Sequence, residues 1–346
     1  MKLRTLFLAL ATLLVALVGV ASAEITLTYA NFPPAATFPS VQMERWAKEV
    51  EKRTGGKVKV KTFPGGTLLN AKNMLEGVTS GTADIGNFAM SYQPGRFPVS
   101  EAVDLYHGFT SATVASQVLF DLVQKYQPRE FEKVKIITLF TCPPTNFMTS
   151  RPVRSMKDLK GMELRVAGTS AEVLKRLGGV PVAMPQSETP EAIQKGVVKG
   201  MISSLEILQD FKFAAYTPNV TVANLPVVSF AVVMNRAKWD GLPADVKKAI
   251  DGLSREQAVW TGEYVDRHVN DALAWSTREY KLQQFSLPPA DRQQIGKLLA
   301  PMTDDYVKKV ASQGLNGRQI VADVQALKAK YEKPAKKGAK QGKKKK

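Results

Sequence analysis

A single arginine, Arg165, stands where a buried guanidinium could bind an anion. Its neighbours Leu164 and Val166 are apolar, so the short strand that contains all three is expected to be largely buried. A buried guanidinium is costly without a partner, and a carboxylate can accept two parallel N–H bonds from it, which lysine cannot reproduce. A helix expected to begin near Thr169 adds a favourable partial charge for an anion. These residues predict a carboxylate site, with an internal salt bridge as the open alternative. The candidate partners for such a bridge are Glu163, Asp84 and Glu188.

Polar and aromatic side chains follow several of the other expected strands. In a doubly wound sheet, ligands bind beyond the carboxyl ends of the strands, and two facing sheets place those ends across a cleft. Aromatic faces, amides and hydroxyls at these positions are typical of a small-molecule site with mostly apolar walls. The candidate binding residues of this kind are Asn31, Phe32, Phe88, Met90, Tyr92, Asn146, Ser203 and Ser204.

No arrangement typical of catalysis accompanies these residues. His107 lies in a Tyr-His-Gly stretch and His268 within an expected helix, and neither has a recognisable catalytic partner. The sequence has no Gly-x-Ser-x-Gly elbow, no phosphate-binding P-loop and no zinc-ligand spacing. Cys142, the single cysteine, is expected to be a small buried packing residue. We therefore predict a binding protein that is not an enzyme, with no cofactor and no metal-ligating residues, and the sequence leaves open whether a metal ion assists carboxylate binding.

The chain that positions these residues alternates strands with helices. Met43, Trp46, Ala47 and Val50 recur at the spacing of a helix with one buried stripe, and beyond Pro243 the pattern predicts one long helix. This succession predicts an α/β fold of two lobes, with doubly wound sheets that share strands. Strands are expected at 25–30, 57–63, 84–89, 134–140, 163–166, 180–184, 201–205 and within 220–234, and shorter helices around 43–50, 70–80, 170–177 and 190–198.

The N-terminus has the three parts of a secretory signal peptide. Lys2 and Arg4 are followed by the apolar run 6–20 and then by small residues that end at Ala23. We expect cleavage after Ala23 and a periplasmic mature protein. A retained membrane anchor is the alternative, and it is disfavoured because the run is short for a bilayer span of roughly 20 residues.

The formal charge of +17 is concentrated at the two ends of the chain. The signal segment carries two of the positive charges and residues 333–346 carry eight lysines and no acid, which leaves +7 for residues 24–332. A lysine-rich end with Gly, Ala and Gln cannot bury a core and is expected to be disordered. This tail is expected to be solvated or weakly attracted to anionic lipid headgroups. Nucleic acid is not an expected partner, because no aromatic stacking motif accompanies the lysines.

At Arg165 the sequence resembles a known family. Residues 157–168, Lys-Asp-Leu-Lys-Gly-Met-Glu-Leu-Arg-Val-Ala-Gly, resemble the arginine-containing segment of the solute receptors of TRAP (tripartite ATP-independent periplasmic) transporters, in the dicarboxylate-receptor branch. The resemblance extends in order over about residues 25–330. The further stretches that carry it are residues 46–64, 81–85, 181–200 and 235–243.

The resemblance implies two α/β lobes that are joined by shared strands and a long helix and that close on the ligand at a hinge. Lobe I would comprise residues 24–140 and about 226–265. Lobe II would comprise residues 141–225 and about 266–332, including the C-terminal helices. The resemblance also implies a receptor that delivers a small organic acid to TRAP-type membrane permease subunits, with membrane contact through the permease or the lysine tail.

The resemblance also implies roles for single residues. By position, the anion-binding arginine of the family is Arg165, a common polar ligand residue falls near Ser203, and the residue after the Met-Pro turn is Gln186. Asn146 stands where dicarboxylate and sialic-acid binders often carry another basic residue, and Met90 stands where sugar-acid binders often have an acid.

These departures leave the expected pocket with one strong anion site. A second carboxylate would be poorly paired, which is costly in a closed cleft. We predict a monocarboxylate with an apolar or aromatic body, stacked by Phe32, Phe88, Tyr92 or Phe147 unless these rings belong to the core. A C4-dicarboxylate receptor, and a ligand sensor that uses the same cleft, are the alternatives.

Overall fold

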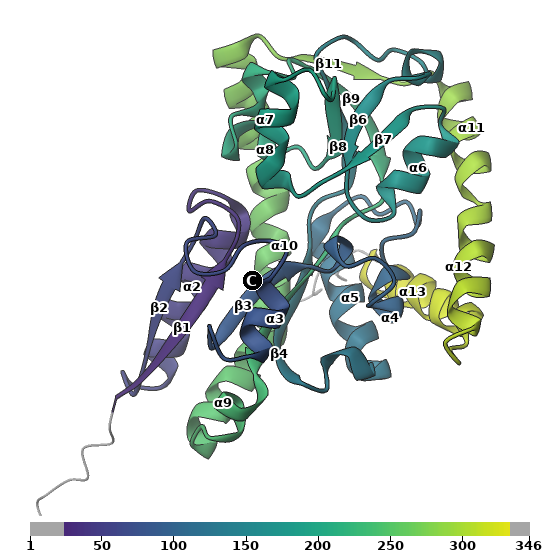
Figure 1. The fold of residues 1–346 in the computed structure, drawn as a ribbon. Helices are drawn as coiled ribbons and strands as arrows, with labels where there is room; N and C mark the ends of the chain where they lie inside the picture. The colour runs from purple at the N-terminus through teal and green to yellow at the C-terminus, as the bar shows by residue number, and fades with distance from the viewer. Residues whose placement is uncertain (1–23, 333–346) are drawn as a thin grey trace, which may run out of the picture.

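Two β-sheets form the framework of the computed structural model, which describes residues 24–332. Sheet I has the strand order β2-β1-β3-β10-β4, and sheet II has the order β11-β9-β5-β8-β6-β7 (Figure 1). The strands of sheet I are β1 (Ile25–Asn31), β2 (Val58–Phe63), β3 (Ile85–Ala89), β4 (Val134–Thr141) and β10 (Ser229–Asn235). Those of sheet II are β5 (Thr145–Thr149), β6 (Glu163–Val166), β7 (Val180–Ala183), β8 (Gly200–Ser203), β9 (Asn219–Leu225) and β11 (Gln283–Ser286).

Each sheet combines a parallel part with one returning strand. β1 pairs in parallel with β2 and β3, and β6 pairs in parallel with β7 and β8. β10 runs antiparallel between β3 and β4, and β5 runs antiparallel between β8 and β9. The parallel strands need crossover connections, which the intervening helices supply. The predicted α/β class is confirmed.

Two short passages of the chain lead directly from a strand of one sheet to a strand of the other, and they lie side by side. β4 leads into β5 through residues 142–144, and β9 leads into β10 through residues 226–228. The Cys142 N–H donates to Val228 O at 3.0 Å, and the Thr145 hydroxyl donates to Pro226 O at 2.7 Å. Paired short crossings of this kind are where a hinge absorbs rotation between two packed units. The predicted sharing takes this form: a strand of one sheet continues into a strand of the other, and within residues 24–332 no strand belongs to both sheets.

One long helix, α10 (Ala244–Tyr280), spans both sheets (Figure 1). Its 37 residues extend over about 55 Å at 1.5 Å per residue. It packs against α2 (Phe38–Arg53), α5 (Ala112–Tyr126) and β4 beside sheet I, and against α8 (Ile207–Asp210) beside sheet II. The predicted long helix is confirmed, and Ile250, Leu253, Val265 and Ala272 are all buried as its spacing requires.

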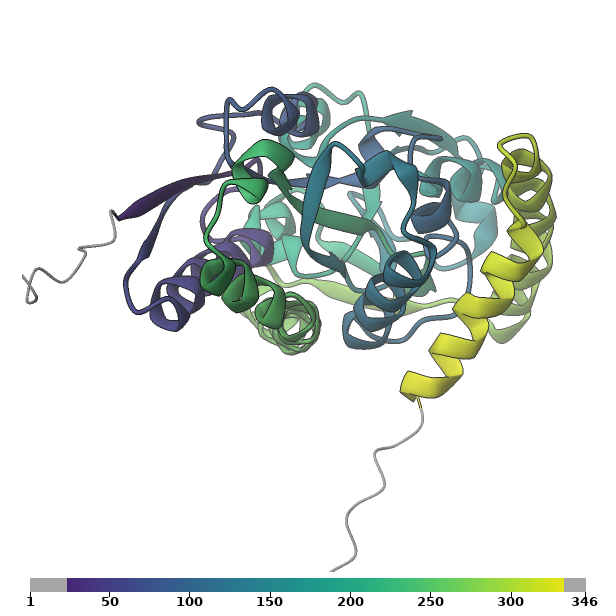
Figure 2. The same ribbon diagram turned by 90° about the horizontal axis from the view of Figure 1, so that it is seen from below.

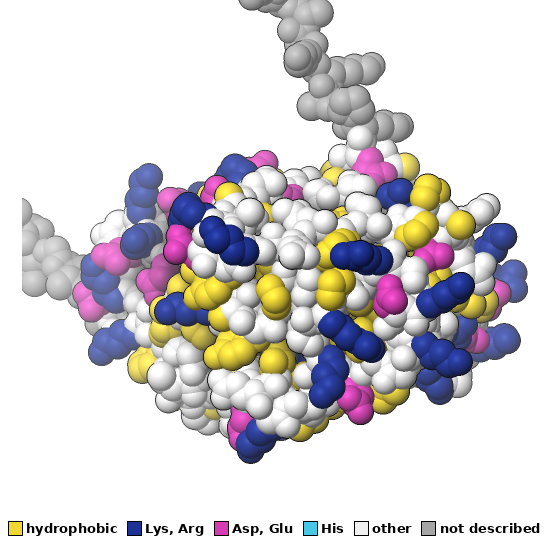
Figure 3. All heavy atoms as spheres, turned by 90° about the horizontal axis from the view of Figure 1, so that it is seen from above, with side chains coloured by type: hydrophobic (Ala, Val, Ile, Leu, Met, Phe, Trp, Pro, Cys, Tyr) yellow, Lys and Arg dark blue, Asp and Glu magenta, His cyan; other side chains and the backbone are white. Residues whose placement is uncertain are grey.

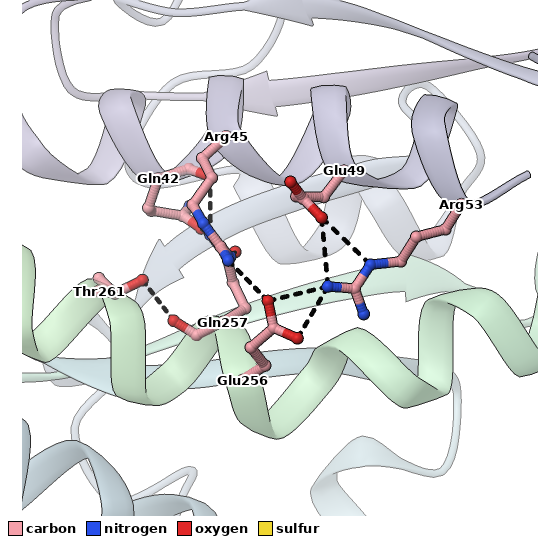
Figure 4. A network of polar contacts seen from close by, with 7 residues as sticks. All are labelled: Gln42, Arg45, Glu49, Arg53, Glu256, Gln257 and Thr261. Atoms are coloured by element: carbon pink, nitrogen blue, oxygen red, sulfur yellow. Dashed lines mark hydrogen bonds and ion pairs between the residues drawn. The ribbon is translucent and has the colours of Figure 1, made fainter.

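A polar network fastens α2 to α10 (Figure 4). Arg45 donates to Gln257 and, at 2.7 Å, to Glu256, and Arg53 donates to both oxygens of Glu256 at 2.8 Å. The Gln257 amide donates to the backbone oxygen of Gln42 at 2.8 Å. The buried end of this network, at Gln257, contributes more to rigidity than its exposed ion pairs do. The network as a whole holds the N-terminal part of α10 to α2, beside sheet I.

The remaining helices cover the faces and one side of the molecule. Figure 2 shows α12 and α13 along one side, where the Asp323 carboxylate of α13 accepts from Lys125 and from the Tyr126 hydroxyl of α5, both at 2.6 Å. The sequence-based assignment of residues 266–332 to lobe II therefore does not hold for α13, since its buried face packs on α5 beside sheet I. The other lobe boundaries stay a prediction. The helices other than α2, α5, α8 and α10 are α3 (Met74–Thr79), α4 (Pro98–Glu101), α6 (Ser170–Arg176), α7 (Thr189–Gln194), α9 (Arg236–Asp240), α11 (Pro289–Leu299), α12 (Pro301–Ala311) and α13 (Gly317–Glu332).

Several element boundaries differ from the predicted ones for local reasons. The helix expected at 70–80 begins only at Met74, because the Asn70 side chain accepts from the backbone N–H groups of Lys72 and Asn73 and makes a turn. Asn146, expected in a loop, lies inside β5. The helix α5 was not predicted.

Lys and Arg side chains are spread over the face seen in Figure 3, with fewer Asp and Glu side chains between them, in keeping with the +7 charge of residues 24–332. No helix within residues 24–332 is long and apolar enough to cross a membrane. The predicted signal peptide and lysine tail lie outside the described residues.

Candidate functional site

A cavity of about 60 Å³ lies between sheet I and sheet II, beside the paired crossings. Most of its lining comes from the carboxyl ends of β1, β3, β4, β6, β7 and β8, where doubly wound sheets bind ligands, and Val228 and Phe230 add the start of β10. One part of the lining is polar and the rest is largely aromatic or aliphatic. The lining residues are Phe32, Pro33, Thr37, Phe38, Pro39, Tyr92, Cys142, Arg165, Ala167, Gln186, Ser203, Ser204, Glu206, Ile207, Asp210, Phe211, Val228 and Phe230.

Arg165 enters this cavity from the buried strand β6 and is only 3% exposed. Its Nε donates to Met184 O at 2.9 Å, Nη1 donates to Gln186 Oε1 at 2.6 Å, and Nη2 donates to the Tyr92 hydroxyl at 3.3 Å. All three partners are neutral. Burial lowers the pKa of the Arg165 guanidinium, because the charged form loses hydration that these groups only partly replace. The guanidinium stays charged, and its three hydrogen-bond partners include no carboxylate.

The three candidate salt-bridge partners of Arg165 are engaged elsewhere or exposed. Asp84 accepts from the Thr28 N–H at 2.7 Å and pairs with Lys238, and Glu188 pairs with Lys72 at 2.7 Å. Glu163 is exposed. Within residues 24–332, no ion pair includes Arg165. The internal salt bridge is therefore not present, and the guanidinium keeps capacity for an external anion.

Tyr92 links the two sheets at this cation. It lies in a short 3-10 turn, η1 (Met90–Tyr92), directly after β3 of sheet I. Its hydroxyl oxygen accepts from Arg165 Nη2 and from the Gln186 N–H at 3.1 Å, both of which belong to the sheet II side. Because both of these bonds use the oxygen as acceptor, the phenolic hydrogen stays available to donate to an anion.

Aromatic rings form much of the remaining wall. The Phe32 ring lies 5.7 Å from the Tyr92 ring, and the Phe38 ring lies 6.1 Å from the Phe230 ring in an edge-to-face arrangement. Phe230 stacks on Phe140 at 5.2 Å, which fixes its orientation from the core side. Such pairs favour a flat apolar body next to the guanidinium.

Two acidic side chains in the lining were missed by the sequence analysis. Glu206 is 1% exposed and Asp210 follows it in α8. The Asp210 carboxylate accepts from the Phe38 N–H at 3.2 Å and contacts His268 Nε2 at 2.6 Å, which raises the pKa of His268. The only local signal was an acid set among apolar residues in Leu205-Glu206-Ile207, since the contact with Phe38 spans 172 residues of sequence.

Cys142 is buried, as predicted, and also lines the cavity. Its sulfur accepts from the Val228 N–H at 3.2 Å, and burial raises the pKa of the thiol well above its usual range. A thiol that stays protonated is a poor nucleophile and a poor metal ligand. Cys142 is therefore part of the apolar wall.

Of the predicted binding residues, Arg165, Phe32, Tyr92, Gln186, Ser203 and Ser204 line the cavity and are brought together there. The others do not line it. Asn31 donates to Ser40 Oγ and accepts from Asn87, both at 2.9 Å, so its amide organises the end of β1. Asn146 Oδ1 accepts from two backbone N–H groups, at Ala223 and Asn224, and so fixes β5 against β9.

The other predicted aromatic and apolar candidates belong to the core. Phe88 packs against Phe97 with ring centroids 5.5 Å apart, and Met90 is 3% exposed in the same cluster. Phe147 lies in β5 and is fully buried.

The two histidines differ in their relation to the cavity, since His268 pairs with the lining residue Asp210 and His107 does not reach it. His107 Nε2 contacts Ala102 O at 2.6 Å and its Nδ1 contacts Gln325 at 2.7 Å, away from the cavity. Among the described residues, no group of three or more His, Cys, Asp or Glu side chains is placed to hold a metal ion.

Comparisons with known proteins match this geometry. The family model of the bacterial extracellular solute-binding proteins, family 7 (DctP), matches residues 30–309. A crystal structure of a TRAP periplasmic solute binding protein from Desulfovibrio salexigens is 50% identical, with a TM-score of 0.81, over 91% of this chain and 99% of that chain. A marine metagenome TRAP solute binding protein specific for aromatic acid ligands, solved with 3-hydroxybenzoate, is 27% identical, with a TM-score of 0.85, over 90% and 100% of the two chains. The C4-dicarboxylate-binding periplasmic protein DctP of Rhodobacter capsulatus is 25% identical over 81% of this chain and 84% of its own length.

Proposed function

Because the chain belongs to the bacterial extracellular solute-binding proteins of family 7, the TRAP solute receptors, we propose that it binds a small monocarboxylate with an apolar or aromatic body. Proteins of this family serve transport, and TRAP solute-binding proteins are periplasmic. The proposal concerns the ligand that this receptor delivers to its membrane permease.

The distribution of charge in the cavity carries the proposal. Among the described lining residues Arg165 is the one cation, whereas Glu206 and Asp210 are acids. A single carboxylate neutralises the buried guanidinium. A second carboxylate on the same ligand would lie near acidic side chains with no further cation, and a buried unpaired charge is strongly unfavourable.

The apolar wall supports the second half of the proposal. Phe32, Phe38, Phe211 and Phe230 surround the space beside the polar end. Burying a flat apolar body against them is favourable by roughly 25 cal/mol per Å². The marine metagenome relative binds 3-hydroxybenzoate, an acid of this shape. The DctP name of the Rhodobacter capsulatus relative keeps a C4-dicarboxylate as the second candidate.

Two further parts of the proposal concern the ends of the chain and the hinge. We propose that the signal peptide is removed after Ala23. Rotation at the paired crossings, residues 142–144 and 226–228, would open and close the cavity. Small-angle scattering should then give a smaller radius of gyration with ligand than without it.

A thermal-shift screen of organic acids tests the ligand class. A ligand at 100 times its dissociation constant stabilises the folded state by about 2.7 kcal/mol, which corresponds to a melting-temperature rise of roughly 5 °C for a protein of this size. We expect benzoate-like acids to produce such shifts and succinate and malate to produce little. Tight binding of succinate or malate together with weak binding of aromatic acids would contradict the proposal and favour the dicarboxylate receptor.

A further inference from the structure

Glu206 is a buried carboxyl group that lines the cavity with one oxygen unpartnered. The side chain is 1% exposed and precedes α8 on the sheet II side. Its Oε1 accepts from the Ser204 hydroxyl at 2.6 Å, whereas Oε2 has no hydrogen-bond partner. Buried polar atoms in native proteins almost always have a partner, so an orphaned oxygen at a binding cavity indicates that the partner comes from the ligand.

The other buried polar groups next to Glu206 are already engaged. Both Asp210 oxygens have partners, at the Phe38 N–H and at His268, and the Cys142 sulfur accepts from a backbone N–H. Arg165 keeps free N–H groups for the carboxylate. Among the described lining residues, Glu206 is therefore the one whose buried side chain has an oxygen with no hydrogen-bond partner.

We propose that Glu206 determines specificity by hydrogen bonding to a hydroxyl group on the body of the ligand, so that the receptor prefers a hydroxylated monocarboxylate to its unsubstituted parent. This inference rests on the proposed function, in which Arg165 holds the carboxylate. It adds a second polar anchor for the ligand, at Glu206.

A hydroxyl is the ligand group that suits Glu206 best. The pKa of Glu206 is raised to about 7, chiefly by burial and also by the Asp210 carboxylate, while the Ser204 hydroxyl and His268 act in the opposite direction. Both forms are thus populated near neutral pH. The neutral carboxyl of Glu206 can donate a hydrogen bond from Oε2, whereas the ionised carboxylate can only accept one. A ligand hydroxyl suits both forms, because it can accept from the first and donate to the second. An ammonium group on the ligand would pair only with the ionised carboxylate of Glu206. A second carboxylate on the ligand would be repelled by that ionised carboxylate.

Calorimetric titration of the full chain at pH 7 with matched acids tests the assignment. The probes are benzoate against its three monohydroxy isomers, and propionate against lactate. We expect the best hydroxy acid to bind roughly 10- to 100-fold more tightly than its parent, because the parent leaves a buried polar oxygen unsatisfied. In Glu206→Leu this preference should disappear, while binding of the parent acid persists through Arg165.

Two further variants make the test specific. Glu206→Gln keeps the oxygen that accepts from Ser204 and supplies an N–H in place of Oε2, so the hydroxyl preference should largely remain. Glu130→Gln is the matched control, since Glu130 Oε2 is also buried without a partner but lies outside this cavity. It should change neither affinity nor preference.

Several outcomes would overturn the assignment. Equal binding of hydroxy and parent acids by the wild type would do so without any variant, as would a preference that survives in Glu206→Leu. Tighter binding of an aminobenzoate than of the hydroxybenzoates would assign Glu206 to a cation instead. Failure of every acid to bind the wild type would overturn the proposed function itself, which distinguishes the two failures.

Discussion

Arg165→Lys removes the geometry of the proposed carboxylate anchor while it keeps the charge. A guanidinium has five N–H groups, and three of them donate to Met184 O, Gln186 Oε1 and the Tyr92 hydroxyl. One N–H on each terminal nitrogen is left, which matches the two oxygens of a carboxylate. Each hydrogen bond to a charged group contributes about 1.5–3 kcal/mol, and lysine can replace one of the two at most. We therefore expect a loss of about 2–4 kcal/mol, or roughly 30- to 1,000-fold in Kd.

The assay is calorimetric titration with the acid that gives the largest thermal shift, together with thermal unfolding of the ligand-free variants. Arg176→Lys is the matched control, because Arg176 is partly exposed in α6 and pairs with Glu172 and Asp305 at 2.7 Å. Its Kd should equal that of the wild type. A folded Arg165→Lys variant with unchanged affinity would refute the anchor. A variant that no longer folds would show that the arginine is needed for the structure itself.

Three other substitutions probe the site and the fold. Tyr92→Phe removes the hydroxyl that bridges the two sheets at the guanidinium and should weaken acid binding by about 1–2 kcal/mol, roughly 5- to 30-fold in Kd, measured by titration. Asp104 is buried and accepts from the hydroxyl of Ser229, in β10, at 2.5 Å. Burial raises the pKa of Asp104 to about 8, above its unfolded value of about 3.9, so the stability from its neutral form is full below pH 4 and is lost as the pH rises through 8. Asp104→Asn cannot ionise, so the melting temperature of the variant relative to the wild type should rise from pH 5 to pH 9; a constant difference would contradict this. Gly200 has φ +151° and a Cβ there would lie 2.1 Å from Met148 O, so Gly200→Ala should lose at least about 1–3 kcal/mol of stability in denaturant unfolding.

Elements with a clear local pattern were predictable from the sequence. β6 has the predicted bounds, 163–166, and α10 was predicted because its buried residues keep helical spacing over many turns. β5 (Thr145–Thr149) was not predicted, because all of its side chains are buried and the strand shows no alternation of apolar and polar residues. Its position depends on pairing with β8 and β9, which come later in the chain.

The residues of the candidate site also divide into those that the sequence predicted and those that it did not. Arg165 was predictable because a charged residue between apolar strand residues is unusual on its own. Asn146 and Phe88 were candidates near the ends of expected strands, as Tyr92 was, yet their side chains turn into the protein, and only tertiary packing decides which side chains face the cavity. Glu206 and Asp210 join the site because the N-terminus of α2 approaches α8 from the other sheet.

In the proposed receptor, the buried guanidinium also connects ligand binding with closure of the cavity. Arg165 and Gln186 lie on the sheet II side, whereas Tyr92 comes from sheet I, so the hydrogen bonds of Tyr92 form only when the two sheets approach. That approach removes Arg165 from water, and the neutral partners Met184 O, Gln186 Oε1 and Tyr92 do not compensate the lost hydration of a cation. A ligand carboxylate does compensate it, and its interaction is stronger in the closed, dry cavity than in the open one. The ligand thus has the differential affinity for the closed state that a population shift requires. A neutral amide of the same acid has no charge to offset the buried cation, so it should fail to close the cavity even where its apolar body fits the aromatic wall.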